Sequence, residues 1–196
     1  MKKGELTKES ILKSAFDLAS VLGLEALTIG KLAEAAGLSK SGLFGHFQSK
    51  ENLQVMVLDY SAEYYIDKVI RPALVKNRGV PRIRAIVDLW IKWTEVTVKG
   101  GCPILTAAIE FDDRPGIVQD KVQELLKSQT KFFEKAADIA KEEGHFNKNL
   151  NSKQFAFEFY SLMVAFQIYS KLLKQKDAKK QFIQAVDDLI EKSSNS

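Results

Sequence analysis

Amino, hydroxyl and imidazole groups suited to binding a polyanion are concentrated between residues 28 and 50. Ser39 can cap a short helix in which Leu43 and Phe47, four residues apart, turn inward. The remaining surface of that helix is small, polar or flat, as a surface that enters the major groove of DNA must be. It carries Lys40, Ser41, Phe44 and His46.

Local charge also favours a phosphate partner. Lys31, Lys40 and Lys50 outnumber Glu34, the single acid between positions 28 and 50. Lys50 lies in the first turn of the next predicted helix, which Ser49 caps, and there an ammonium and free backbone N–H groups together suit a phosphate.

Two short helices joined by a glycine turn must position these groups. Thr28 can cap the first helix, whose apolar residues recur at helical spacing and include Leu32. Gly37 closes it, and Ala33 is small enough for two helices to cross at a steep angle. An earlier helix, capped by Thr7, carries a broad apolar stripe and ends near residue 23. Many all-helical proteins contain such a pair, so the caps and periodicity alone do not establish DNA binding.

The order of the residues is more specific. Thr-Ile, Leu-Ala, Ala-Gly-Leu-Ser, Leu-Phe, His-Phe and Ser-Lys-Glu-Asn-Leu, in this register, resemble the N-terminal domain of the TetR family of bacterial transcriptional regulators. The resemblance implies a DNA-binding domain over residues 5–64, with the helix-turn-helix at 28–47, and a helical effector-binding and dimerisation domain over 65–196. The DNA contacts that it implies are Thr28, Ser39, Lys40, Ser41, Gly42, Phe44, His46 and Lys50.

Two positions depart from the pattern of that family. Phe44 stands where a tyrosine is frequent, so a phenolic hydroxyl to phosphate is missing. Gly45 stands where a larger residue is usual, and it weakens the helix by about 0.5 to 1 kcal/mol relative to alanine.

Beyond residue 70 the chain reads as helix after helix, without strand-like alternation. Glycine and proline divide it into segments near 82–98, 103–111, 115–143, 151–174 and 178–192. We therefore expect an all-α fold of about nine helices: an N-terminal three-helix, helix-turn-helix DNA-binding domain, followed by a helical ligand-binding and dimerisation bundle.

Segment 151–174 is apolar on nearly every face, so it must be covered on more than one side. In the TetR family the last two helices form a four-helix interface with a partner, which implies a homodimer. The alternative is a helix central to the core of one subunit. The expected interface residues are Phe159, Met163, Phe166, Phe182, Val186, Leu189 and Ile190.

The aromatic residues of the body suggest an effector pocket, which relatives hold between the fourth, fifth, seventh and eighth helices. Aromatic stripes usually only pack, so plain core is the alternative. An apolar or aromatic small molecule is the favoured effector. The expected pocket residues are Tyr60, Tyr64, Trp90, Trp93, Phe111, Phe133 and Tyr160.

The resemblance therefore implies a homodimeric repressor that a small-molecule effector releases from a palindromic double-stranded DNA operator. A helical dimeric ligand-binding or interaction protein without DNA binding, or a ligand-dependent activator, is the alternative. No enzyme is expected, because neither His145 nor Cys102 has a catalytic partner at recognisable spacing, and no cofactor motif occurs.

Composition and the remaining motifs agree with this prediction. The chain of 196 residues is 45% hydrophobic with a net charge of +4, which suits a globular protein but decides nothing about its partner. A single cysteine and the lack of an apolar leader or spanning segment suggest the cytoplasm and no membrane partner. No metal is expected, because the carboxylates of Glu110, Asp112 and Asp113 more simply favour the N-terminus of the helix that follows Pro115.

Overall fold

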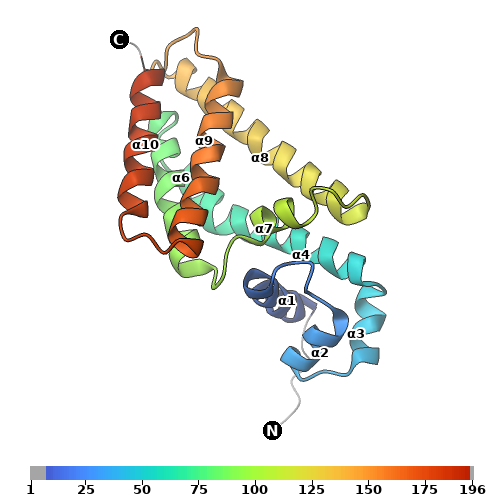
Figure 1. Cartoon of the computed structure of the whole chain (residues 1–196). Coiled ribbons are helices and arrows are strands. Elements are labelled where there is room, and N and C mark those ends of the chain that lie inside the picture. The colour runs from blue at the N-terminus through green and yellow to red at the C-terminus, as the bar shows by residue number, and fades with distance from the viewer. Residues whose placement is uncertain (1–7, 195–196) are drawn as a thin grey trace. The chain divides into compact units, whose positions relative to one another are not determined.

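The computed structural model describes residues 8–194, and every regular element in that range is a helix (Figure 1). Thr7 and the first residues of the predicted DNA-binding domain lie outside the described residues. The elements are α1 (Lys8–Leu22), α2 (Ile29–Ala36), α3 (Lys40–Phe47), α4 (Lys50–Tyr65), η1 (Ile66–Ile70), α5 (Arg71–Leu74), α6 (Val80–Lys92), η2 (Trp93–Thr97), α7 (Pro103–Glu110), α8 (Ile117–Glu142), α9 (Ser152–Gln167), η3 (Ile168–Leu172) and α10 (Ala178–Ser193).

The labels η1, η2 and η3 denote π-helical turns that directly extend α-helices. Because α4, η1 and α5 follow one another without a break, the ten α-helical stretches between residues 8 and 194 amount to nine helices. The predicted all-α fold is confirmed. None of the helices described combines the length and the apolar character that a membrane crossing requires.

Packing divides the chain into two compact units. Unit 1 comprises Met1–Tyr64 and Val98–Leu125, and unit 2 comprises Tyr65–Thr97 and Leu126–Ser196. The second segment of unit 1 contains α7 and the beginning of α8. The expected functional division between residues 64 and 65 stays a prediction.

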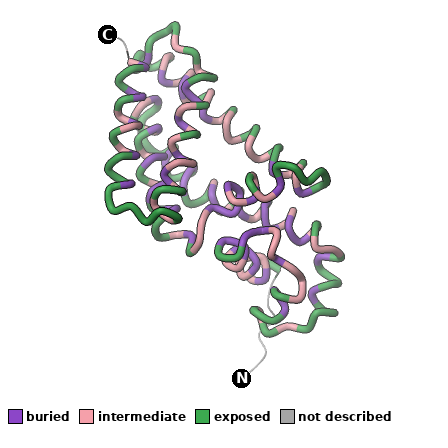
Figure 2. Tube along the Cα trace, in the orientation of Figure 1, coloured by how far each residue is buried: buried purple, intermediate pink, exposed green. Residues whose placement is uncertain are grey.

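Capping fixes the turn between α2 and α3 in unit 1. The N–H of Gly37, which has a φ of 65°, donates to the carbonyls of Ala33 and Glu34, and the N–H of Leu38 donates to Ala33 at 2.9 Å. Beneath the turn the side chains of Leu32, Leu43 and Phe47 are buried, as expected. Figure 2 shows buried and exposed positions alternating along these short helices.

The segment from 98 to 125 packs closely on α1 within unit 1. A Cβ at Gly100 would overlap the carbonyl of Ser20, and the N–H of Gly101 donates to that carbonyl at 3.0 Å. Glycine is therefore required at position 100 for the two backbones to approach one another.

Unit 2 contains the apolar helix expected at 151–174. The residues that α9 buries include Phe155, Phe159, Met163 and Phe166. The ring of Phe166 stacks on Phe182 of α10, with centroids 4.8 Å apart. α9 is thus covered by α10 of the same chain along this face.

Candidate nucleic-acid interface

Two side-chain caps shape the candidate interface. The hydroxyl of Thr28 accepts a hydrogen bond from the N–H of Lys31 at 3.1 Å, and Ser39 accepts one from the N–H of Gly42 at 3.1 Å. Each hydroxyl satisfies one of the N–H groups that a helix start leaves without a partner. The predicted caps of α2 and α3 are confirmed.

Burial separates the two faces of α3. Leu43 and Phe47 are 1% exposed, whereas the rest of the helix faces solvent. Of the eight expected contact residues, Thr28 and Lys50 are half-buried. The exposed ones are Ser39, Lys40, Ser41, Gly42, Phe44 and His46.

Lys40 and Thr28 are brought together at the start of α2. A Cβ at Gly30 would lie 3.3 Å from Cε of Lys40, 3.6 Å from its Nζ and 3.8 Å from the hydroxyl of Thr28. The side chain of Lys40 therefore crosses the first turn of α2. It lines a surface pocket of about 500 Å³ there. An ammonium and a helix start together favour an anion at this place.

Lys50 is engaged elsewhere. Its Nζ lies 2.9 Å from Oε1 of Glu25, while Arg114 lies 3.5 Å from Oε2 of the same carboxylate. The hydrogen bond from Lys50 is the main cause that lowers the pKa of Glu25, and the charge of Arg114 adds to it. A phosphate must compete with Glu25 for Lys50. Glu25 and Arg114 could not be found from the sequence, because no local pattern links residues so far apart.

The carboxylate of Glu110 has a different role from the one expected. It accepts hydrogen bonds from the backbone N–H groups of Leu24 at 2.8 Å and Glu25 at 3.0 Å. Glu110 therefore holds the connection between α1 and α2 instead of favouring the start of α8. Within residues 8–194 no three potential ligands gather to hold a metal ion.

The aromatic residues expected in an effector pocket fall into separate clusters. In unit 1, Phe16 contacts Tyr60 and Tyr64 edge to face, with ring centroids 5.8 and 5.4 Å apart. Phe111 is buried in the same unit, with the guanidinium of Arg114 6.0 Å from its ring centroid. These contacts account for packing in unit 1.

Unit 2 contains the second cluster. Trp90 and Trp93 are each 1% exposed, and the ring of Tyr65 meets both edge to face, at 6.0 and 5.5 Å. Trp90 Nε1 donates to the carbonyl of Met163 at 3.3 Å. Tyr65 was not among the expected pocket residues; the expected Tyr60 and Tyr64 lie on another face of α4.

Thr94 lies beside these tryptophans in the chain and was also missed. It is fully buried, and its hydroxyl has no hydrogen-bond partner among the described residues. Phe133, also buried, contacts Phe159 at 5.0 Å and Tyr160 at 6.4 Å between ring centroids. Unit 2 thus contains, at the residue that follows Trp93, a buried hydroxyl without a partner in the described part of the chain.

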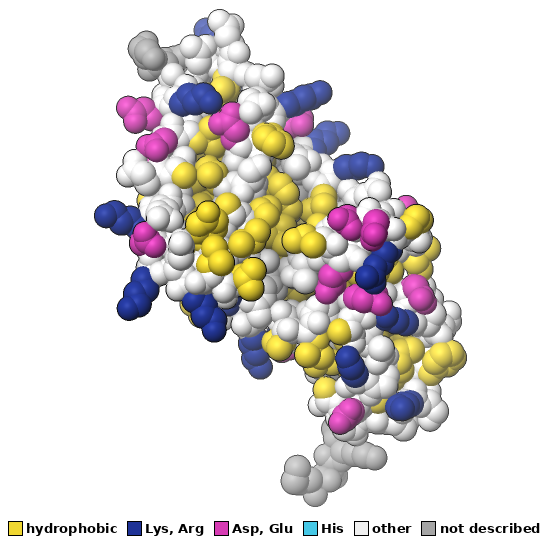
Figure 3. Space-filling view, viewed as in Figure 1, with side chains coloured by type: hydrophobic (Ala, Val, Ile, Leu, Met, Phe, Trp, Pro, Cys, Tyr) yellow, Lys and Arg dark blue, Asp and Glu magenta, His cyan; other side chains and the backbone are white. Residues whose placement is uncertain are grey.

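The residues expected at a dimer interface are buried within the single chain. Their exposed fractions lie between 1% and 6%. Phe166 packs on Phe182 of α10, and Phe159 packs on Phe133 of α8. Beside them, α9 and α10 form a groove of about 250 Å³, and Figure 3 shows apolar side chains gathered over these helices. The groove is lined by Leu162, Ala165, Phe166, Tyr169, Ala178, Gln181, Phe182 and Ala185.

Two family descriptions match the chain. Residues 11–55 match "Bacterial regulatory proteins, tetR family", and residues 79–186 match "Tetracyclin repressor-like, C-terminal domain". The nucleoid occlusion factor SlmA of Vibrio vulnificus is 27% identical over 94 residues, which are 48% of each chain. The chain thus spans about half the length of the curated relatives it matches.

Solved structures cover nearly the whole chain. A TetR transcriptional regulator from Chloroflexus aurantiacus J-10-FL has a TM-score of 0.82 and 25% identity, over 97% of this chain and 95% of that one. AibR, in complex with isovaleryl coenzyme A and operator DNA, has a TM-score of 0.70 and 20% identity, over 92% and 94%. The fold therefore agrees with the two family matches.

Proposed function

Because the chain belongs to the TetR family of bacterial regulatory proteins, we propose that it is a homodimeric repressor that a small-molecule effector releases from a palindromic operator. The observation that carries DNA binding is the exposed face of α3, with Lys40 crossing the start of α2. A polar helix face flanked by ammonium groups suits a major groove lined by phosphates.

Dimerisation would use the groove between α9 and α10. Tyr169, which lines the groove, is 43% exposed, and Leu172 of the same π-helical turn is 76% exposed. Burial of such side chains is a main driving force of association. Two copies would then carry two recognition helices to successive major grooves, about 34 to 36 Å apart, so the operator would be an approximate palindrome.

Effector binding is supported by the aromatic cluster of unit 2 with the buried hydroxyl of Thr94. Aromatic walls with one polar group are typical of small-molecule sites. AibR, which shares the fold, was solved with isovaleryl coenzyme A and operator DNA. Coupling of about 1 to 3 kcal/mol between the two sites would change DNA affinity about 5- to 150-fold.

A helical dimer without DNA binding is the second candidate, and it leaves the exposed lysines of the candidate interface without a role. A ligand-dependent activator would use the same DNA contacts and would differ only in the direction of its response to the effector. DNA-binding experiments distinguish the helical dimer without DNA binding from the proposed repressor. Transcription assays distinguish the activator from the repressor.

The proposed function is tested by selecting bound sequences from a random duplex pool. The wild type should enrich a palindrome with half-sites about one turn apart, and Lys40→Ala and Lys50→Ala should weaken its binding. Lys50→Ala should act about uniformly across sequences and lower the magnitude of the salt slope by about 2, since each of the two subunits loses one phosphate contact. Lys131→Ala, which removes an exposed charge from unit 2, is the control. Enrichment of no sequence, with and without small-molecule extracts, would refute the proposal.

A further inference from the structure

Phe44 is the most unusual side chain of the candidate interface. It lies in the middle of α3 and is 57% exposed. Among the described residues of unit 1 it is the only exposed phenyl or phenol ring; the others are buried or half-buried. An apolar ring at the centre of a polar face therefore needs an explanation.

The surroundings of Phe44 leave its ring accessible. A Cβ at Gly45 would meet nothing within 4 Å, and Gly42 likewise carries no side chain. The residues one turn earlier on the same face are Lys40 and Ser41, both exposed. A flat duplex edge can therefore approach the ring and the helix backbone closely.

The chemistry of the ring limits what it can recognise. Phenylalanine has no hydroxyl, so Phe44 cannot donate a hydrogen bond to a phosphate or to a base edge. The edges of bases in the major groove are polar except for the C5-methyl group of thymine. Among the base edges, that methyl group is the apolar partner on which sequence-dependent contact with the ring can rest.

We propose that Phe44 is a specificity-determining residue that recognises a thymine methyl group in each half-site of the operator. This inference rests on the proposed function and adds the base that α3 reads. Lys40, at the start of the same helix, supplies charge, whereas Phe44 supplies an apolar contact that depends on sequence. Thymine is therefore preferred at one position in each half-site.

The expected loss of affinity corresponds to one methyl group that is no longer buried in each half-site. Burial of one such group from water changes an equilibrium about three- to fivefold. Because a palindrome presents the contact twice, removal of both methyl groups should lower affinity roughly 10- to 20-fold. A larger loss would require contacts beyond the methyl group.

The test replaces thymine by deoxyuridine, which lacks only the methyl group, in the sequence selected from the random pool. Symmetric pairs are replaced one at a time, and binding is measured by fluorescence anisotropy. For the wild type, replacement of one particular symmetric pair should lower affinity roughly 10- to 20-fold. Phe44→Ala should bind the thymine and deoxyuridine duplexes equally at that pair, while Phe44→Leu should retain part of the difference.

A structural control accompanies the test. Because the ring is mostly exposed, Phe44→Ala should unfold in urea at nearly the same concentration as the wild type. If the wild type binds every deoxyuridine duplex as tightly as the thymine duplex, the inference is wrong and the proposed function stands. The same holds if Phe44→Ala loses as much affinity as the wild type when thymine is replaced. Failure to enrich any sequence would overturn the proposed function, and the inference with it.

Discussion

Nζ of Lys50 lies 2.9 Å from Oε1 of Glu25, so the lysine best placed for a phosphate at the start of α4 is already paired within unit 1. Both side chains are partly exposed, at 34% and 41%, and such pairs are worth about 0 to 1 kcal/mol. Glu25→Gln should therefore release Lys50 and raise operator affinity up to about fivefold per subunit, or up to about 25-fold for a dimer, measured by anisotropy at several salt concentrations.

Loss of a negative charge by itself also strengthens binding to DNA, so a second variant that loses the same charge is needed for comparison. Glu51→Gln removes an exposed carboxylate next to Lys50 and should give a smaller gain. In the double variant Glu25→Gln/Lys50→Ala the extra gain should disappear. Equal gains from Glu25→Gln and Glu51→Gln would contradict competition between Glu25 and phosphate.

Gly23→Ala should destabilise the protein by about 2 to 4 kcal/mol in urea unfolding. Position 23 has a φ of 85°, which strains a residue with a Cβ by about 1 to 2 kcal/mol. The new Cβ would also overlap the carboxylate of Glu110, which binds two backbone N–H groups. Displacing that carboxylate leaves both donors without their charged partner.

Gly37→Ala separates the two causes. Its φ of 65° imposes the same kind of strain, but a Cβ there would meet nothing within 4 Å. We expect a loss of about 1 to 2 kcal/mol. If Gly23→Ala and Gly37→Ala lower the free energy of unfolding equally, the hydrogen bonds that Glu110 accepts contribute nothing to stability.

Thr94→Val should stabilise the protein without ligand by about 1 kcal/mol, because it replaces a buried hydroxyl that has no hydrogen-bond partner by a methyl group of similar shape. Thr97 donates a hydrogen bond to the carbonyl of Lys92 at 3.3 Å, so Thr97→Val in the same π-helical turn should bring no gain. Urea unfolding measures both. A destabilised Thr94→Val protein would show that the hydroxyl is bonded.

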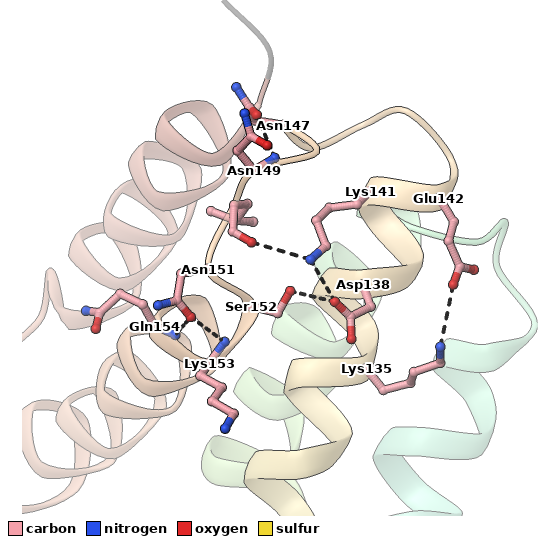
Figure 4. A network of polar contacts seen from close by, with 11 residues as sticks. Lys135, Asp138, Lys141, Glu142, Asn147, Asn149, Asn151, Ser152, Lys153 and Gln154 are labelled. Carbon is pink, nitrogen blue, oxygen red and sulfur yellow. Dashed lines mark hydrogen bonds and ion pairs between the residues drawn. The ribbon is translucent and has the colours of Figure 1, made fainter.

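Asp138 gives a prediction that depends on pH (Figure 4). Its carboxylate accepts hydrogen bonds from Lys141 at 2.8 Å and Ser152 at 2.7 Å, which lower its pKa, with Lys141 the larger cause. A lowered pKa in the folded state means that the stabilisation is present at neutral pH and is lost as the pH falls through that pKa. Asp138→Asn should therefore reduce the free energy of unfolding at pH 7 by about 0.5 to 1 kcal/mol.

The difference between Asp138→Asn and the wild type should shrink as the pH falls below about 4, the ordinary range of an aspartate. Urea unfolding at several pH values measures it. Ser152→Ala, which removes one donor and keeps the charge, should give a smaller difference with the same trend. A difference independent of pH would show that the charge of Asp138 is not what stabilises the connection between α8 and α9.

Local signals predicted the helices and missed the contacts between distant residues. Caps and apolar spacing lie within a few residues of one another, so Thr28, Gly37 and Ser39 could be assigned from sequence. The carboxylates of Glu25 and Glu110 bind groups that only the folded chain brings near. The π-helical turns were also missed, because their sequences resemble those of ordinary helix ends.

Binding to operators with altered half-site spacing would show whether two copies of α3 lie on one face of DNA. A selected palindrome, the same site with five base pairs inserted at its centre, and a single half-site are compared by anisotropy. Since five base pairs turn the second half-site to the opposite face, the inserted site should bind no better than the single half-site. Undiminished affinity for the inserted site would show that the protein does not bind DNA through two copies of α3 on one face.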